Sequence, residues 1–528
     1  MSRRVLIVLT LLTSVASLLL LWTDWLPLGV PGEWTWARLS YSTPGLLWSG
    51  LICTAAAAAY GTFAWLGDRR MATASRGEAM LWLLALVAAG FSWLWAVQSA
   101  SIEGVGLSKS PYVLYYRRTE GYYWQARYDV TSVAEFLVGY EQLLAERDYL
   151  HIGTHPPGLT LLYCGLINSC ERWPGLVRLA ETTMPADMRQ TLEMMEQQVQ
   201  SGGTEFTQRD SACLWLATLA TQLAAALVVI PMYRYLRLSS ERAAVWRTVV
   251  LWPLVPSVAI FLPKSDVLYP VLGLTAGWMF RAAWYRSRER LTLMTVVCAV
   301  LGGLVVVGGM VLSLAFLSVL ALIGMQWLCD VLAERRDDRQ RTERVAHELT
   351  IAACLLGCFL IALGGVMTAF GYRELNLLNV WQWNLSNHAL FYEHNARTYW
   401  KWLLINPLEI TLAAGTPIVA LVKWGAWRQL RNWRDYLSSP VVPFTVVWML
   451  LWLSGKNMGE ASRLWILILP WLVAAAINAF AAANSTGQPT APPASRRLWL
   501  AFLVLQMIVS SATLLRVDGF HFTELLKP

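Results

Sequence analysis

The sequence predicts an all-α protein that crosses a lipid bilayer many times, and three observations support this fold class. Of the 528 residues, 56% are hydrophobic and only 14% are charged, whereas soluble proteins average about 25% charged residues. The apolar residues form continuous runs of the length that a membrane-spanning helix needs. These runs are rich in leucine, alanine and valine, and they lack the alternating pattern of transmembrane β-strands. The composition excludes a disordered chain and a disulfide scaffold.

We expect thirteen crossings, and the 29 tryptophans are typical of anchors at the membrane–water interface. The crossings lie near residues 5–22, 45–66, 79–98, 211–232, 245–262, 267–284, 292–310, 311–330, 348–370, 402–422, 441–454, 464–482 and 498–515. The first of them is expected to be a retained helix, because it ends in LWTDWLPLG and lacks a small-residue cleavage site.

The distribution of lysine and arginine predicts the orientation. With a cytoplasmic N-terminus, the cytoplasmic segments hold 24 basic residues and the outer segments hold 14. A further crossing at 156–170 would reverse all later loops and place the basic ones outside. We therefore expect this short apolar segment to lie half-inserted or on the surface, followed by an amphipathic outer connector at 171–210. The net charge of +8 then reflects topology, and no nucleic-acid partner is expected.

We divide the chain into three parts. Residues 1–78 form two N-terminal transmembrane helices, and residues 79–482 form the main transmembrane module. Residues 483–528 begin with a linker rich in proline, serine and threonine and end with a C-terminal transmembrane helix. The cytoplasmic loops contain no glycine-rich phosphate loop, so nothing supports ATP-driven transport.

Polar side chains concentrate in two outer loops of the main module. Loop 99–155 is dense in tyrosine, arginine and carboxylates, and loop 371–401 is rich in asparagine, tryptophan and tyrosine. Five of the six histidines also fall outside. Polar chemistry on one side of a many-helix protein predicts a site at that membrane surface. Aromatic and amide side chains of loop 371–401 suit the stacking and hydrogen bonding of sugars.

The sharpest pattern lies in loop 99–155. Tyr128 and Asp129 precede a segment of helical spacing from Val130 to Tyr149, which contains Glu135, and the motif THPPG with His155 follows 26 residues after Asp129. Purely structural roles also explain these residues, since aspartate favours helix N-caps and proline favours a first helical turn. The spacing of the histidines does not predict a zinc site, because glycine and proline interrupt the segment.

Charged residues also stand at the outer ends of two later helices. The turn LPKSD contributes Lys264 and Asp266, and the segment GEASRLW contributes Glu460 and Arg463, shortly after Lys456. A surface turn, an ion pair between residues three apart and a snorkelling lysine are the corresponding structural explanations.

Together these motifs resemble the GT-C superfamily of membrane glycosyltransferases. The most similar members are the glycosyltransferase family 39 enzymes, such as protein O-mannosyltransferases and lipid A aminoarabinose transferases. Those carry an acidic motif in the first outer loop and an HPP or KPP tripeptide further on. LPKSD resembles their Leu-Pro-x-Asp turn, and GEASRLW resembles a segment of actinobacterial-type arabinosyl and mannosyl transferases. The chain departs from the family in its two additional N-terminal helices, in Tyr-Asp-Val as the acidic motif, and in the surface position expected for 156–170.

The resemblance implies a GT-C-like fold with an outer-face catalytic loop after the third helix, in a bacterial cytoplasmic membrane. It implies an inverting transfer from a polyprenyl-phosphate-sugar donor to an unknown glycan, lipid or protein acceptor. Asp129 matches the general base. The residues implied to bind the donor phosphate are His155, Lys264, Lys456 and Arg463. Those implied to support the site or bind the acceptor are Tyr128, Glu135, Asp266 and Glu460. The resemblance leaves open whether a divalent cation binds near the phosphate.

The sequence leaves two alternatives to a glycosyltransferase. A transporter or flippase for a lipid-linked saccharide is the main alternative, although the expected helices are nearly free of charge and show no internal repeat. An oligosaccharide polymerase or ligase would need a large outer loop late in the chain, for which loop 371–401 is a modest candidate.

Overall fold

The structure is a computed structural model, and it describes residues 3–102, 105–287, 292–333, 341–430, 433–480 and 496–520. The described chain is helical almost throughout, and its four strands form two short antiparallel pairs. Strand β1 (Gly29–Val30) pairs with β2 (Trp34–Thr35), and β3 (Ala37–Arg38) pairs with β4 (Val517–Asp518). The predicted linker at the start of 483–528 lies outside the described residues as far as residue 495.

Within the described ranges, nine helical segments are long and apolar enough to cross a membrane. They are α1 (Arg3–Trp22), α2 (Thr43–Met71), α3 (Arg76–Ser99), α12 with α13 (Gln208–Leu227, Val229–Leu236), α17 (Leu293–Leu312), α18 (Phe316–Ala333), α19 (Arg341–Gly371), α25 to α27 with the short turn η6 (Ala461–Leu464, Ile466–Ile468, Leu469–Ala475, Ile477–Phe480) and α28 (Arg496–Arg516). The chain is an all-α polytopic membrane protein, as the composition predicted.

The predicted crossing at 402–422 is sharply bent. Helices α21 (Tyr399–Ala414) and α22 (Thr416–Gln429) meet at 102°, and they make a tenth span if the pair is counted as one. Gly415 stands between them with φ +89°, a conformation that residues with a Cβ rarely adopt. The proline at the start of α22 has no N–H to continue the hydrogen bonds of α21.

Three other predicted crossings do not form a single helix that is long and apolar enough to count among the nine spans. The segment 245–262 forms α14 (Arg242–Val249), the turn η3 (Trp252–Leu254) and α15 (Pro256–Phe261), because two prolines interrupt it. The segment 441–454 forms the 13-residue α24 (Val441–Leu453), after the short α23 (Trp433–Leu437). The segment 267–284 becomes α16 (Tyr269–Ser287), which is not among the nine spans. A total of thirteen crossings therefore stays a prediction.

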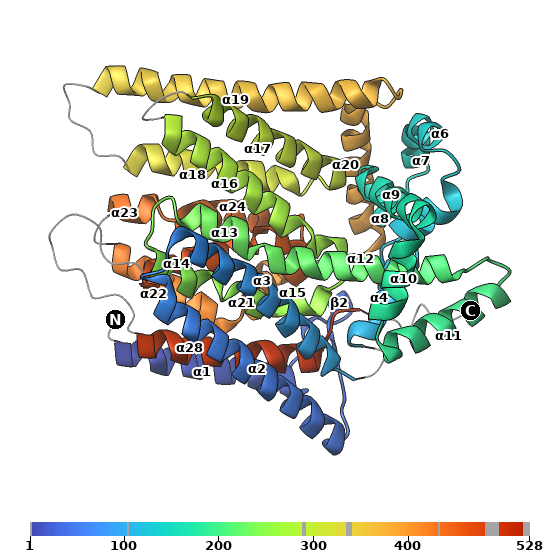
Figure 1. Ribbon diagram of the computed structural model, residues 1–528, viewed down its shortest axis with the longest axis horizontal. Coiled ribbons are helices and arrows are strands. Elements are labelled where there is room, and N and C mark those ends of the chain that lie inside the picture. The colour runs from blue at the N-terminus through green and yellow to red at the C-terminus, as the bar shows by residue number, and fades with distance from the viewer. Residues whose placement is uncertain are drawn as a thin grey trace.

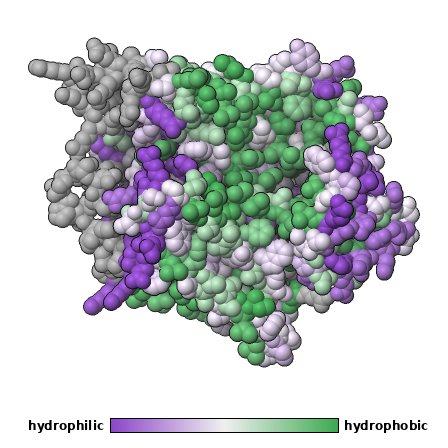
Figure 2. Space-filling model, viewed as in Figure 1, coloured by the Kyte–Doolittle hydropathy of each residue, from purple (hydrophilic) through white to green (hydrophobic). Residues whose placement is uncertain are grey.

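The molecule has an apolar band between two polar ends. Figure 2 shows hydrophobic side chains across the middle of the bundle and hydrophilic ones gathered at both sides. The long helices run from one polar end to the other, with the N-terminus at one of them. Such a band is what a protein embedded in a bilayer presents to lipid. We call the polar end that carries helices α4 to α11 the α4–α11 end (Figure 1).

The α4–α11 end is built from short helices. They are η1 (Leu107–Lys109), α4 (Ser110–Tyr115), α5 (Tyr122–Trp124), the π-helical turn η2 (Gln125–Asp129), α6 (Val133–Val138), α7 (Tyr140–Ala145), α8 (His151–Thr154), α9 (Gly158–Arg172), α10 (Pro174–Thr183) and α11 (Ala186–Ser201). The single helix expected from Val130 to Tyr149 is thus wrong, because it is divided at Gly139 into α6 and α7. Helices α8 to α11 all lie at this end in Figure 1, and the surface position of 156–170 stays a prediction.

Tryptophan serves the interior of this bundle as well as its surface. Eight tryptophans are among the largest fully buried side chains: Trp93, Trp215, Trp246, Trp252, Trp402, Trp465, Trp471 and Trp499. Six of these eight indole N–H groups donate to acceptors inside the protein, whereas that of Trp93 has no acceptor among the described residues. Trp246 donates to the carbonyl of Ala64 at 2.9 Å, and Trp252 donates to that of Ala225 at 2.7 Å. Buried indoles commonly make such bonds, so the tryptophan content reports helix packing in addition to interface anchoring.

Candidate functional site

A buried carboxylate, Glu120, lies in the loop between α4 and α5 and is 0% exposed. Its Oε1 accepts a hydrogen bond of 2.7 Å from the backbone N–H of Ser265. Its Oε2 accepts a longer one of 3.5 Å from the hydroxyl of Tyr163 in α9. Burial raises the pKa of Glu120 to about 7, although nearby Lys264 acts in the opposite direction. Glu120 is therefore a carboxyl group poised to exchange a proton near neutral pH.

Lys264 faces the same place from the turn that precedes η4 (Ser265–Val267), and it is 4% exposed. Its Nζ donates to the carbonyl of Thr119 at 2.7 Å and to Nε2 of His151 at 3.4 Å. An ammonium group has three donors, and within the described chain these are the two acceptors found. Burial lowers the pKa of Lys264 to about 8. The lysine thus keeps one N–H for a ligand and is a cation at neutral pH.

The histidines His151 and His155 are held as neutral rings. Nδ1 of His155 lies 3.0 Å from the carbonyl oxygen of His151, which only accepts, so Nδ1 carries the hydrogen and Nε2 offers a lone pair. Burial lowers the pKa of His155 to about 4, and burial together with Lys264 lowers the pKa of His151. At neutral pH His155 therefore offers a hydrogen-bond acceptor and no positive charge.

Asp266, Glu460 and Arg463 form an ion-pair group beside Lys264. The guanidinium of Arg463 lies 2.7 Å from Glu460 Oε2 and 3.5 Å from Asp266 Oδ2. Glu460 has φ +54° and follows Gly459 at φ +86°. A non-glycine residue in this conformation is strained, and such strain is often found at functional sites. Arg463 thus joins α25 to the turn that carries Lys264.

We call this group the Lys264 cluster. Its members are Glu120, His151, His155, Lys264, Asp266, Glu460 and Arg463. Residues more than 300 positions apart in the sequence meet here, at the α4–α11 end of the bundle. Group transfer from a phosphate leaving group to a hydroxyl requires a general base and nearby cations. The cluster brings a carboxylate, a lysine and an arginine together in this way.

Helix α20 (Leu377–His394) fixes the backbone that carries the two histidines. Asn384 Nδ2 donates to the carbonyls of Gly153 and His155 at 3.1 and 3.0 Å. Asn387 Nδ2 donates to the carbonyls of Leu144 and Gly153 at 3.0 and 3.1 Å. Both asparagines are buried. The asparagines of loop 371–401 expected to bind sugars thus include two that hold the neighbouring loop in position.

Asp129 and Glu135 form polar contacts other than those of the Lys264 cluster. Asp129 ends η2, its side chain is 40% exposed, and it forms an ion pair with Arg117. Glu135 is exposed in the first turn of α6, where Thr131 donates to it at 3.5 Å. Within the described chain, neither residue forms a hydrogen bond or ion pair with Lys264 or Glu120. The catalytic assignment of Asp129 stays a prediction.

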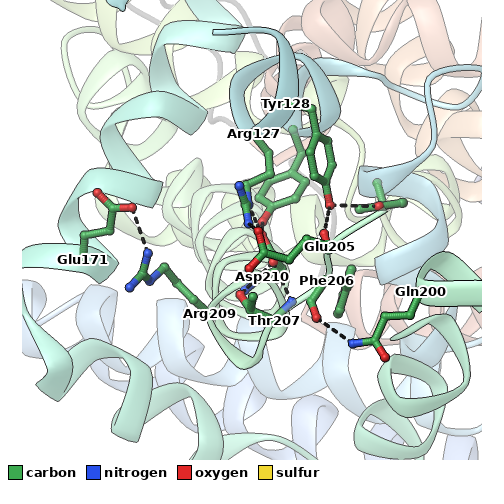
Figure 3. A network of polar contacts seen from close by, with 11 residues as sticks. Arg127, Tyr128, Glu171, Gln200, Glu205, Phe206, Thr207, Arg209 and Asp210 are labelled. Carbon is green, nitrogen blue, oxygen red and sulfur yellow. Dashed lines mark hydrogen bonds and ion pairs between the residues drawn. The ribbon is translucent and has the colours of Figure 1, made fainter. Parts of the chain in front are cut away.

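Tyr128 belongs to a different network at the start of α12 (Figure 3). Its hydroxyl donates to the carbonyl of Glu205 at 2.8 Å. Next to it, Arg127 Nε donates at 2.8 Å to the buried Asp210. Thr207 and Asp210 form a capping box, in which each side chain bonds the backbone N–H of the other. Arg127 and Tyr128 point onto this helix start in Figure 3, so they anchor the loop that follows Glu120 to α12.

Lys456 lies on the margin of the site. Its side chain is exposed, and its carbonyl accepts a hydrogen bond from Tyr392 of α20. It contributes, after burial, to the lowered pKa of His388. Lys456 is therefore near α20 and solvent, and among the described residues it forms no hydrogen bond with Lys264.

Sequence reasoning missed Glu120 and His151. Glu120 stands in a charged run, RRTEG, that looks like any solvated loop, and nothing next to His151 in the sequence distinguishes it from a surface histidine. The signal that distinguishes Glu120 is its contact with Ser265, 145 residues away, which no local pattern contains. In the part of the chain that the structure describes, no three His, Cys, Asp or Glu residues come together as a metal site.

Comparison of the chain with models of known protein families and with curated proteins finds no match.

Proposed function

We propose that this protein is an integral membrane glycosyltransferase that moves a sugar from a polyprenyl-phosphate donor to an acceptor hydroxyl with inversion. The observation that carries the proposal is the Lys264 cluster, in which a buried carboxylate with a raised pKa stands beside a lysine and an arginine, the latter at the start of the span Ala461–Phe480. A lipid-linked substrate would present its phosphate at this depth. The motif resemblance points to the same reaction class.

In the proposed step, Glu120 is the general base. The acceptor oxygen bonds to the anomeric carbon while the bond from that carbon to the phosphate oxygen breaks. The hydroxyl proton passes to the Glu120 carboxylate, and the electron pair leaves with the lipid phosphate. A pKa of about 7 suits this role, because a base is most effective when its pKa lies near the operating pH. Asp129 remains the competing assignment, and it differs by being exposed and paired with Arg117.

The leaving phosphate is stabilised by Lys264 and Arg463 in this proposal. The third N–H of Lys264 is directed to a phosphate oxygen, where a buried ammonium is worth more than one in water. Asp266 and Glu460 orient Arg463. His155 is neutral, so its Nε2 accepts a hydrogen bond from a hydroxyl of the sugar or of the acceptor. Lys456 supplies a solvent-exposed cation at the margin.

The proposal also includes the number of membrane crossings and the orientation of the protein. Thirteen crossings in a GT-C-like arrangement would place the α4–α11 end on the outer face of a bacterial cytoplasmic membrane. The excess of basic residues in the opposite loops supports this orientation.

The test is a transfer assay with the purified full-length protein in liposomes. Polyprenyl phosphates carrying a labelled hexose, pentose or aminopentose are offered with a membrane extract as the source of acceptors. We expect one donor to lose its label to an acceptor, and Lys264→Met to reduce turnover at least 100-fold. Lys423→Met is the matched control, since Lys423 is an exposed lysine of α22. Absence of transfer from every donor, or equal turnover by Lys264→Met, would overturn the proposal.

The transporter alternative is tested in the same liposomes. The buried ion pair Arg281–Asp330 between α16 and α18 is of the kind found in transport pathways. Movement of the labelled donor from one leaflet to the other, without release of the sugar from its phosphate, would favour this alternative over an enzyme.

A further inference from the structure

A second candidate site lies away from the α4–α11 end. A cavity of about 360 Å³ opens between α16, α18 and α19. Its apolar wall includes Phe280, Leu320, Ile323, Leu355 and Phe359. The volume falls in the range of about 300–1,000 Å³ that is common for ligand sites. None of the residues assigned to sugar transfer lines it.

One wall of the cavity is polar, and it is electrically neutral. Arg281 and Asp330, each with a side chain 4% exposed, form an ion pair of 3.2 Å. Gln326 Nε2 donates to Asp330 at 3.0 Å, and the hydroxyl of Tyr235 donates to Gln326 at 2.8 Å. Since the pair cancels its own charge, the cavity offers no net charge to a ligand. A phosphate group would therefore find no counterion comparable to the Lys264 cluster.

The cavity opens on the surface that faces the bilayer. Leu356 of α19 lines it and is also 57% exposed. Gly324 of α18 also lines the cavity, and a Cβ placed on it would meet nothing within 4 Å. Both residues belong to the spans that form the apolar band. The molecules that reach such an opening are the lipids around the protein.

We propose that this cavity binds one acyl chain of a bilayer phospholipid, which enters sideways between α18 and α19. Apolar cavities exclude water and bind apolar molecules of matching size. The neutral polar wall and the opening onto the apolar band select a hydrocarbon chain over a charged head group. The bound chain fills the space between α19 and the pair α16 and α18, and so helps to hold α19 on the bundle.

The test uses the full-length protein in lipid nanodiscs that contain phosphatidylglycerol with a diazirine on one acyl chain. After irradiation, labelled residues are mapped by mass spectrometry. We expect label on Leu320 and Leu355, competed in a saturable manner by unlabelled phosphatidylglycerol. Gly324→Leu fills the opening with a good helix former, and we expect at least a tenfold loss of this label. Gly308→Leu is the matched control, because Gly308 of α17 also has open space at its Cβ and does not line the cavity.

The outcomes separate the proposal from its alternatives. Label spread evenly over the exposed face of α19, or label that does not saturate, would overturn a specific site. So would equal labelling of Gly324→Leu, with its fold checked by gel filtration. Stronger labelling by a diazirine-bearing polyprenyl phosphate than by phosphatidylglycerol would overturn the assignment to a phospholipid. None of these measurements depends on sugar transfer.

Discussion

Two carboxylates lie fully inside the α4–α11 end, and their surroundings are opposite. Asp210 is 1% exposed and accepts four hydrogen bonds. Two come from Tyr123 at 2.5 Å and Arg127 at 2.8 Å, and two of 2.7 Å come from the backbone and side chain of Thr207. Each oxygen of Asp210 thus has two donors, and Figure 3 shows the carboxylate enclosed by them.

Glu120 is buried to the same degree but has fewer donors. One of its bonds is 2.7 Å long and the other is at the limit of 3.5 Å. Burial raises the pKa of Glu120 to about 7, and Lys264 and the bond from Ser265 offset this rise only in part. The comparison teaches that burial alone does not mark a functional carboxylate. Glu120 differs because its carboxylate oxygens accept few hydrogen bonds although Lys264 lies nearby. It can therefore take up a proton.

The largest effect is expected for Glu120→Gln. Removing a general base reduces the rate by about 10²–10⁴-fold, and we expect this loss in kcat with donor binding retained. Stability at pH 8 should not fall, because the wild-type protein bears the cost of a buried charge there. A raised folded pKa makes this cost grow as pH rises through about 7. Turnover in liposomes and apparent Tm in detergent are the two measurements.

Asp129→Asn decides between the two assignments of the base. If Glu120 is the base, this variant keeps turnover within a fewfold of wild type, since it removes only an exposed ion pair with Arg117. Loss of turnover in Asp129→Asn together with an active Glu120→Gln would return the role to Asp129. Glu135→Gln, at an exposed position of α6, is the control for a carboxylate change in the same loop.

Asp210→Asn should show the reverse behaviour. Breaking a buried ion pair by removing one partner costs about 3–5 kcal/mol, and Arg127 is 25% exposed, so we expect the lower end, about 3 kcal/mol. The unfolding transition should shift, while kcat of the folded fraction stays near wild type. A stable variant with abolished kcat would mean that Asp210 acts in the reaction, and the contrast with Glu120 would fail.

The pH dependence of kcat/KM is expected to be bell-shaped. Below about pH 7 Glu120 is protonated and no longer accepts a proton, so activity should fall about tenfold per pH unit. Above about pH 8 Lys264 loses its proton and its charge, so activity should fall again. Because Glu120 and Lys264 interact, the acid and alkaline limbs of the pH profile report the titration of both groups together. An acid limb near pH 4 would point to a carboxylate outside the Lys264 cluster.

The sequence was sufficient for the fold class and for part of the site. Runs of apolar residues predict spanning helices because a bilayer imposes their length, and charged residues at helix ends predicted Lys264, Asp266, Glu460 and Arg463. These four do meet, across two separate segments. The two motifs predicted this meeting of charged residues because each lies on a tight turn between packed helices.

The sequence was not sufficient where long-range packing decides. The bend at Gly415 depends on a neighbouring segment, because the side chain of Gln506 lies where a Cβ on Gly415 would stand. Glu120 and Asp129 are nine residues apart in one polar loop, and both look like ordinary solvated carboxylates. Only the fold buries one against Ser265 and leaves the other paired at the surface. Spacing within a loop does not encode that choice.

A small effect is expected for Asn384, which reaches the Lys264 cluster only through the backbone. Asn384→Ala removes two bonds, to Gly153 and His155, and each hydrogen bond contributes about 0.5–1.5 kcal/mol. We expect Tm to fall slightly and kcat/KM to fall severalfold, with the pH profile unchanged because Glu120 and Lys264 keep their surroundings. The matched control is Asn379→Ala on the same helix, where the amide bonds Glu141 at the surface. Equal kinetic losses in both variants would show that α20 acts only by overall stability, whereas a selective loss in Asn384→Ala makes it a positioning residue for His155.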